Sequence, residues 1–161
     1  MLDLQVLLKL VSNLGYVGAL IAGVLGSSSL FISFFPSYIV IALLGATLNP
    51  IAVGLLGGLG AGIGQFLHYY IGLGGRYVIP NKWKGRLDVW RMKLDKYGVL
   101  LIFAFAATPL TPDDIIWIPL GAMKYPKLKA LIAAVSGKML LNLVYAHVGY
   151  FGWESIARFF T

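Results

Sequence analysis

Two adjacent acids and one lysine are the groups most able to do chemistry, because they lie within stretches that are otherwise apolar. Asp113 and Asp114 follow Thr111-Pro112, and Lys138 lies inside the apolar run 131–150. Ionisable groups in the interior of a membrane are costly and are therefore functional candidates. Two neighbouring carboxylates in a poorly solvated site can share one proton, which would suit a proton-coupled process.

The same residues also allow a purely structural interpretation. Thr111 as N-cap, Pro112 at the first helical position and acids at the positive end of the helix dipole form a good helix start. Lys138 is expected near the midplane, where its ammonium group needs Asp113, Asp114 or an anionic lipid headgroup as partner. It could instead extend its side chain to the membrane surface.

Two further polar side chains lie in apolar runs. Asn142 is one turn after Lys138 on the same helical face, and His68 could relay protons or simply pack as a hydrogen-bonded histidine. We find no Ser-His-Asp order, no metal-ligand spacing and no phosphate-binding loop. The chain also has no cysteine. We therefore expect no enzymatic activity, no cofactor and no metal site.

The elements that carry these residues are membrane helices. Only 12% of the residues are charged, and none lies between Leu10 and Gly75. A helix needs about 20 apolar residues to cross a bilayer. We expect a single domain over 1–161 in the cell membrane, with several passes and about three spanning helices. The first of these is predicted over 4–26.

The net charge of +7 does not indicate nucleic-acid binding, because the cations lie beside apolar segments. The segment 81–97 contains Trp83, Leu87, Trp90, Leu94 and Tyr97 at steps of four and three residues, with cations between them. This spacing predicts an amphipathic helix in the membrane interface, with Asn81 as its N-cap and the aromatic residues on one face. The expected membrane-surface residues are Trp83, Trp90, Lys84, Arg86 and Arg91. The excess of cations places this segment on the cytoplasmic side.

Two apolar segments are interrupted by proline. The run 98–123 is broken at Pro109 and Pro112, and both of its flanks are basic. If it entered the membrane and returned, both flanks would stay in the cytoplasm, so we predict a re-entrant hairpin. The run 30–48 is broken at Pro36 and is the second candidate hairpin.

An internal repeat appears when the sequence is compared with itself at an offset of 76. Pro36 then meets Pro112, Leu44-Gly45-Ala46 meets Leu120-Gly121-Ala122, and Pro50 meets Pro126. Matched prolines and glycines count most, because each restricts the backbone. Repeat 1 covers 30–75 and repeat 2 covers 98–150, each with a hairpin and a long helix. One crossing between the hairpins would invert the second copy, a design known from transporters. The alternative is chance similarity between apolar segments.

These features together resemble the DedA family, whose domain is also called the VTT or SNARE-associated domain. The resemblance rests on Phe35-Pro36-Ser37, Gly45-Ala46, the glycine-rich stretch 57–64, Pro109 with Pro112, and Leu120-Gly121-Ala122-Met123. It implies an all-α membrane fold with two opposed re-entrant hairpins and a role in moving lipids. Many members have Glu where this chain has Tyr38, and Arg where it has Ala106. These departures argue against the family's proton-coupled recycling of undecaprenyl phosphate.

The leading prediction is a flippase or scramblase that moves phospholipid or polyprenyl-phosphate lipid across the bilayer. Its expected partners are anionic or phosphate-bearing lipids, with no nucleic acid, and a homodimer is an option because so few spans enclose little space. A proton- or ion-coupled carrier of a small solute is the alternative, and a membrane scaffold without transport is the third.

Overall fold

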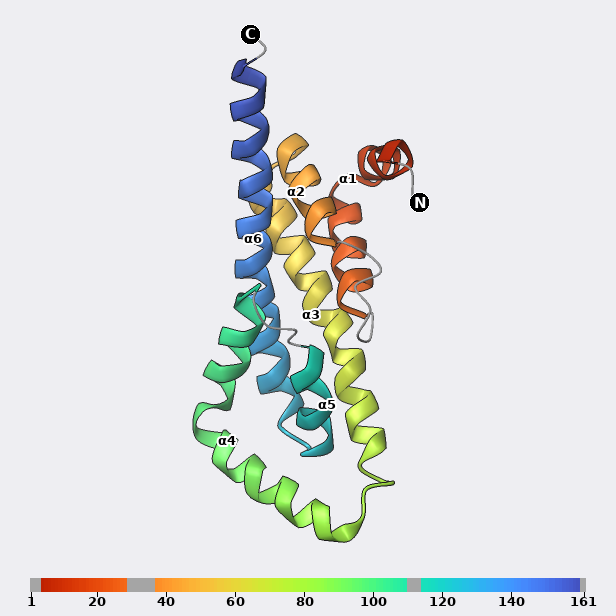
Figure 1. Cartoon of the computed structure of the whole chain (residues 1–161), viewed down its shortest axis with the longest axis vertical. Coiled ribbons are helices and arrows are strands. Elements are labelled where there is room, and N and C mark those ends of the chain that lie inside the picture. Colours follow the sequence, from red (N-terminus) through yellow and green to blue (C-terminus); the bar gives the residue numbers. More distant parts are fainter. Residues whose placement is uncertain (1–3, 29–36, 110–113, 160–161) are drawn as a thin grey trace.

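The fold is all-helical over the residues that the computed structural model describes, which are 4–28, 37–109 and 114–159. The helices are α1 Leu4–Ser28, α2 Ser37–Thr47, α3 Pro50–Gly75, α4 Asn81–Ala107, α5 Asp114–Ala122 and α6 Lys127–Phe159. Figure 1 shows an elongated bundle in which α3 and α6 run along most of its length. Within the described ranges, Pro50–Gly75 and Lys127–Trp153 are long and apolar enough to cross a membrane.

The centre of the bundle is the antiparallel crossing of α3 and α6. Glycines at every fourth position of α3, Gly54 and Gly62 among them, face α6. A β-carbon at Gly54 would lie 2.6 Å from the Cα of Leu143, and one at Gly62 would lie 2.9 Å from the Cα of Val135. The helix backbones are therefore closer than any larger side chain would permit. Small residues at this spacing let helix backbones approach closely in a membrane.

The first predicted span differs in the structure. α1 is kinked at Gly15, whose φ of 49° and ψ of −129° are not helical. Only Leu14–Ser28 continues as an apolar helix along the bundle, packed through Gly23 against α3. That segment is shorter than the roughly 20 residues needed to cross a bilayer. The described residues therefore contain two candidate spans, and the third of the roughly three predicted spans stays a prediction.

Helix α4 also differs from its predicted bounds. It does not end at Tyr97 but continues through Gly98 to Ala107, and Pro80 rather than Asn81 occupies the N-cap position. Gly98 is buried against Tyr125, whose hydroxyl oxygen would lie 2.8 Å from a β-carbon there. Figure 1 shows α4 crossing the lower end of the bundle and then turning upward beside α6. The predicted interfacial helix and the first arm of the second hairpin are thus one element.

The short helices α2 and α5 each pack against a long helix that is distant in sequence. Gly45 of α2 lies against Ala146 of α6, with 2.6 Å between the Ala146 Cα and the place of a β-carbon. Gly121 of α5, 76 positions after Gly45, lies against the backbone of Tyr69 and Leu73 in α3. Each short helix therefore covers the long helix of the other half of the chain.

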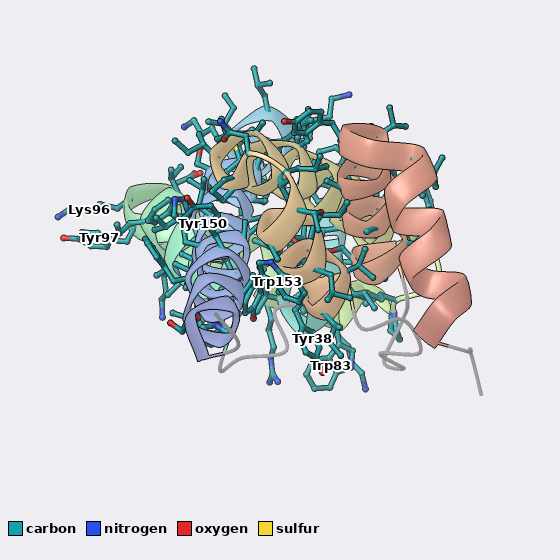
Figure 2. All side chains as sticks on the ribbon, turned by 90° about the horizontal axis from the view of Figure 1, so that it is seen from above. Tyr38, Trp83, Lys96, Tyr97, Tyr150 and Trp153 are labelled. Carbon is teal, nitrogen blue, oxygen red and sulfur yellow. The ribbon has the colours of Figure 1, made fainter. Side chains whose placement is uncertain are left out.

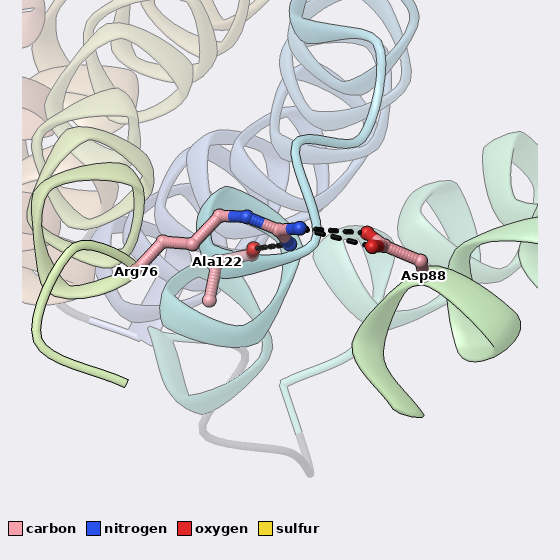
Figure 3. Close-up of polar contacts among 3 residues, drawn as sticks. All are labelled: Arg76, Asp88 and Ala122. Carbon is pink, nitrogen blue, oxygen red and sulfur yellow. Dashed lines mark hydrogen bonds and ion pairs between the residues drawn. The ribbon is translucent and has the colours of Figure 1, made fainter. Parts of the chain in front are cut away.

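One end of the bundle carries most of the cations and is called the basic end below; it holds residues 76–97 and 124–129. Arg76, just after α3, donates one hydrogen bond to the carbonyl oxygen of Ala122 at 2.7 Å. Its other terminal nitrogen contacts both carboxylate oxygens of Asp88 at 2.9 and 3.1 Å (Figure 3). Arg76 thereby joins the ends of α3 and α5 to α4.

A buried tyrosine pair holds the same end together. The Tyr69 hydroxyl donates a 2.6 Å hydrogen bond to the carbonyl oxygen of Tyr125. Burial, and to a lesser extent the nearby Asp95 carboxylate, raises the pKa of the Tyr125 hydroxyl above its ordinary value. The Tyr125 side chain therefore stays neutral and packs as part of the core around Trp117.

Candidate functional site

Lys138 and Asn142 lie one turn apart on α6, and both are buried, with 9% and 7% of their surface exposed. The Asn142 side-chain nitrogen donates a hydrogen bond to the Lys138 carbonyl oxygen at 2.8 Å. Lys138 is eleven residues beyond Lys127, which places it about 16 Å along the helix axis at 1.5 Å per residue. A bilayer core is about 30 Å thick, so this cation is close to the middle of the predicted span.

Three helices meet at this level. A β-carbon at Gly57 of α3 would lie 3.3 Å from the Asn142 side-chain oxygen and 3.4 Å from a side-chain carbon of Ile41 in α2. The absence of a side chain at Gly57 therefore leaves room for the amide of Asn142 between α2, α3 and α6. Asn142 lies in this junction and Lys138 is buried one helical turn before it on α6. A buried amide with a buried lysine one turn away is suited to bind an anionic group.

His68 is fully buried on α3 but does not lie beside Lys138. The residue level with Met139, and so next to Lys138, is Gly58. His68 is ten residues further along α3, which amounts to about 15 Å along the axis. The candidate residues are thus spread along the bundle, with His68 nearer to the basic end.

Gln65 is a buried polar residue that the sequence predictions did not include as a candidate. Gln65 lies seven residues after Gly58 and seven before Gly72, so it shares the helix face that carries these glycines. A fully buried amide must be compensated by hydrogen bonds, so its position in a glycine-lined helix was an available signal.

The acids of the second hairpin are only partly covered. Asp113, together with Pro112 and Pro36, lies outside the described residues, and of Asp114 the structure describes only its place as the first residue of α5. The predicted helix start at Thr111 and Pro112 lies outside the described residues and stays a prediction. Pro109 is exposed in the turn that follows α4.

The aromatic surface of α4 is arranged differently from the prediction. Leu87 and Leu94 pack against the core, whereas Trp83, Trp90 and Tyr97 remain exposed. The bundle therefore covers the leucine edge of the predicted apolar face and leaves its aromatic residues exposed. Figure 2 shows Tyr97 pointing away from the bundle with Lys96 beside it.

Cations stack on the exposed rings instead of occupying the opposite face. The Arg86 guanidinium lies 4.8 Å from the ring centre of Trp83, and the Lys93 ammonium lies 5.3 Å from that of Trp90. Among the other predicted surface residues, Lys84 and Arg91 are half-buried on the side that faces the bundle.

A match to a family model shows to which family the chain belongs. The VTT domain matches residues 35–151, which include α2 to α5 and most of α6. The chain belongs to the DedA family. No curated protein and no solved structure matches it. The earlier resemblance is confirmed, and the chain is a member of a family of membrane proteins.

Two positions where this DedA protein departs from the family's pattern carry packing contacts. The Tyr38 ring lies 6.0 Å from that of Tyr145, which joins α2 to α6. Ala106 is buried, and a β-carbon at Gly137 would lie 2.7 Å from the Ala106 side chain. Because α4 and α6 touch at this point, an arginine at position 106 would not fit without separating them.

Proposed function

We propose that this DedA protein is a lipid translocase of the cell membrane, a flippase or scramblase, in which Lys138 receives the lipid phosphate. The observation that carries the proposal is the burial of Lys138 near mid-span, one helical turn before Asn142 at the junction of α2, α3 and α6. Phosphate is the anionic group common to phospholipids and polyprenyl-phosphate lipids, and its tails would stay in the bilayer during transfer.

The membrane fold proposed with this function is an inverted repeat with two re-entrant hairpins. The sequence predicts the first hairpin over 30–48, of which 30–36 lies outside the described residues. We now propose that the segment 14–28 forms this hairpin together with α2, and that the end of α4 with α5 forms the other. The reciprocal contacts of Gly45 and Gly121, each on the long helix of the opposite half, support this interpretation. The basic end would face the cytoplasm, because cations are enriched in cytoplasmic loops.

In the proposed mechanism, the start of α5 supplies a second contact for the phosphate. Helix N-termini attract anions through their free amide groups and the helix dipole. Asp113 and Asp114 would hold the Lys138 ammonium between transport events and release it to the phosphate. Asn142 would set the position of the phosphate site along the bundle axis. We propose no bond-breaking step and therefore no enzymatic activity.

Lipid movement in proteoliposomes tests this function. The assay uses a headgroup-labelled phospholipid in one set of vesicles and a labelled polyprenyl phosphate in another. Lys138→Met and the pair Asp113→Asn/Asp114→Asn are expected to abolish movement. Lys129→Met removes an exposed lysine from the same helix and is the matched control. Full movement with Lys138→Met would contradict the assignment of the phosphate to this residue.

The alternative function is a proton- or ion-coupled carrier of a small solute. It is favoured by the separate burial of His68 and Lys138, since two titratable groups at different depths could pass a proton along the bundle. Folded protein that moves neither lipid above empty vesicles would favour this carrier, or a scaffold without transport.

Cysteine labelling tests the topology, since the chain contains no cysteine. Lys82→Cys and Lys127→Cys flank the proposed second hairpin, and both positions are exposed. Both should react with an impermeant reagent from the cytoplasmic side only. Thr47→Cys, an exposed position at the other end of the bundle, should react only from outside. Labelling of residues 82 and 127 from opposite sides would exclude the re-entrant hairpin.

A further inference from the structure

The turn between α3 and α4 exposes apolar side chains at the basic end of the bundle. Tyr77 and Val78 are 81% and 84% exposed, more than any other large apolar side chain in the described part of the chain. Exposed apolar groups of this size usually mark a contact surface. They directly follow α3, a candidate membrane span, so the apolar phase within reach is the edge of the bilayer.

An open groove lies beside this turn. Its volume is about 570 Å³, and it is lined by Ile79, Pro80, Trp83, Arg86, Leu87 and Trp90. Five of its six lining residues are apolar or aromatic, and the sixth is a cation. The groove therefore offers apolar side chains that can contact hydrocarbon and one cation that can bind a negatively charged group.

Among the described residues, no acid side chain pairs with Arg86. The nearest acid in sequence, Asp88, pairs instead with Arg76 at 2.9 Å. Within the described residues Arg86 forms no salt bridge, and its guanidinium group is held 4.8 Å above the Trp83 ring. Stacking on a ring leaves the N–H groups at the edge of the guanidinium available to a phosphate, which they can bind in a bidentate manner.

We propose that this groove binds the headgroup of one anionic phospholipid, with Arg86 as its charged partner and Trp83 and Trp90 against its glycerol and upper acyl chains. The segment 76–97 carries seven cations and only two acids, which provides the complementary charge. The inference rests on the membrane location of the basic end, but it does not require that the protein transports lipid.

Tryptophan quenching by brominated lipids tests this site without measuring transport. The full-length protein carries Trp153→Phe, so that its exposed tryptophans are the groove residues Trp83 and Trp90, while Trp117 is fully buried. It is reconstituted in phosphatidylcholine bilayers that contain either brominated phosphatidylglycerol or brominated phosphatidylcholine. The relative association of the two lipids is read from the quenching at equal mole fractions.

We expect phosphatidylglycerol to be preferred by about five-fold, since one cation near the surface contributes about a factor of five. Arg86→Gln should reduce the preference to nearly one. Lys82→Gln removes an equally exposed charge that does not line the groove, and it should leave the preference nearly unchanged. Arg86→Lys keeps the charge without the planar fork and should fall between Arg86→Gln and the unaltered groove.

Two results would overturn the proposal. Equal losses for Arg86→Gln and Lys82→Gln would show a diffuse attraction of the whole basic surface. No preference for the anionic lipid would exclude a lipid phosphate as the occupant. A failure of lipid transport in the separate flux assay would leave this binding result unchanged, so the two proposals can fail independently.

Discussion

A methyl group at Gly54 tests how closely α3 and α6 approach. In the substitution Gly54→Ala, the new β-carbon would lie 2.6 Å from the Leu143 Cα and 2.8 Å from its backbone nitrogen. Carbon atoms in contact are normally about 3.5–4.0 Å apart, so the helices must separate by roughly 1 Å. Because both atoms belong to the backbone, no side-chain rotation can relieve the clash.

The expected cost follows from two opposing effects. Inserting a carbon into a packed interior costs about 1–3 kcal/mol, while replacing glycine by alanine within a helix returns at most about 1 kcal/mol. Gly54→Ala should therefore lower the free energy of unfolding by about 1–2 kcal/mol. The control is Gly74→Ala in the same helix, where a β-carbon meets nothing within 4 Å.

The assay is unfolding of the purified protein in mixed micelles of increasing SDS content, followed by far-ultraviolet circular dichroism. Gly74→Ala should be as stable as the unaltered chain or slightly more stable. If Gly54→Ala were as stable as Gly74→Ala, the close α3–α6 contact would be refuted. The position of Asn142 beside Gly57 would then also lose its basis.

Substitutions at four further positions have defined outcomes. Asn49→Ala removes an N-cap that accepts from two amides at the start of α3, and it should cost about 1 kcal/mol in the same SDS titration, whereas Asn49→Asp should not. Arg76→Gln removes the hydrogen bond to the last carbonyl of α5 and should speed hydrogen exchange at the amides near the junction by about five-fold, because a partly exposed hydrogen bond contributes roughly 1 kcal/mol. Ala106→Arg should destabilise the protein by at least about 2.5 kcal/mol, because it places a charge in a buried membrane position. Tyr38→Glu, at a half-exposed position, should leave the protein folded as judged by size-exclusion chromatography.

The sequence predicted the long helices and their packing because these depend on local patterns. The stretch 50–75 has the length and apolarity of a span, and its glycine spacing indicates close contact with another helix. The kink at Gly15 could not be predicted in this way. Gly15 is one of 20 glycines, and no local signal distinguishes it from those that lie within straight helices. Its positive φ depends on how the following segment packs against α3.

The surface of α4 shows a second limit. A repeat of four and three residues places Leu87 in the same stripe as Trp83 and Trp90, but the stripe does not reveal which of its edges meets the bundle. That choice depends on tertiary packing, which brings Leu87 against the core. Gly98 reads as a helix-breaking residue, yet its contact with Tyr125 needs a residue without a side chain within a continuing helix.

The candidate site was predicted in part for the same reason. Lys138 could be recognised because a charge in an apolar run is visible in the sequence. To predict that Lys138 and His68 lie at different depths, one must know which residues of α3 lie beside which residues of α6. No local sequence pattern contains this information. Gln65 was not chosen as a candidate, because an uncharged amide stands out less than a charge although its burial is complete.

The reciprocal packing of α2 and α5 has a consequence for the order of biosynthesis. Helix α2 leaves the ribosome well before its partner α6, which follows it by 80 residues (Thr47 to Lys127). Until α6 is made, the face of α2 that carries Gly45 lacks its contact with Ala146, so the first half must wait in the membrane with that face uncovered. A chain that stops before α6 would leave this face open to quality-control proteases. Synthesis of α6 therefore acts as a checkpoint for completion of the helix bundle described above.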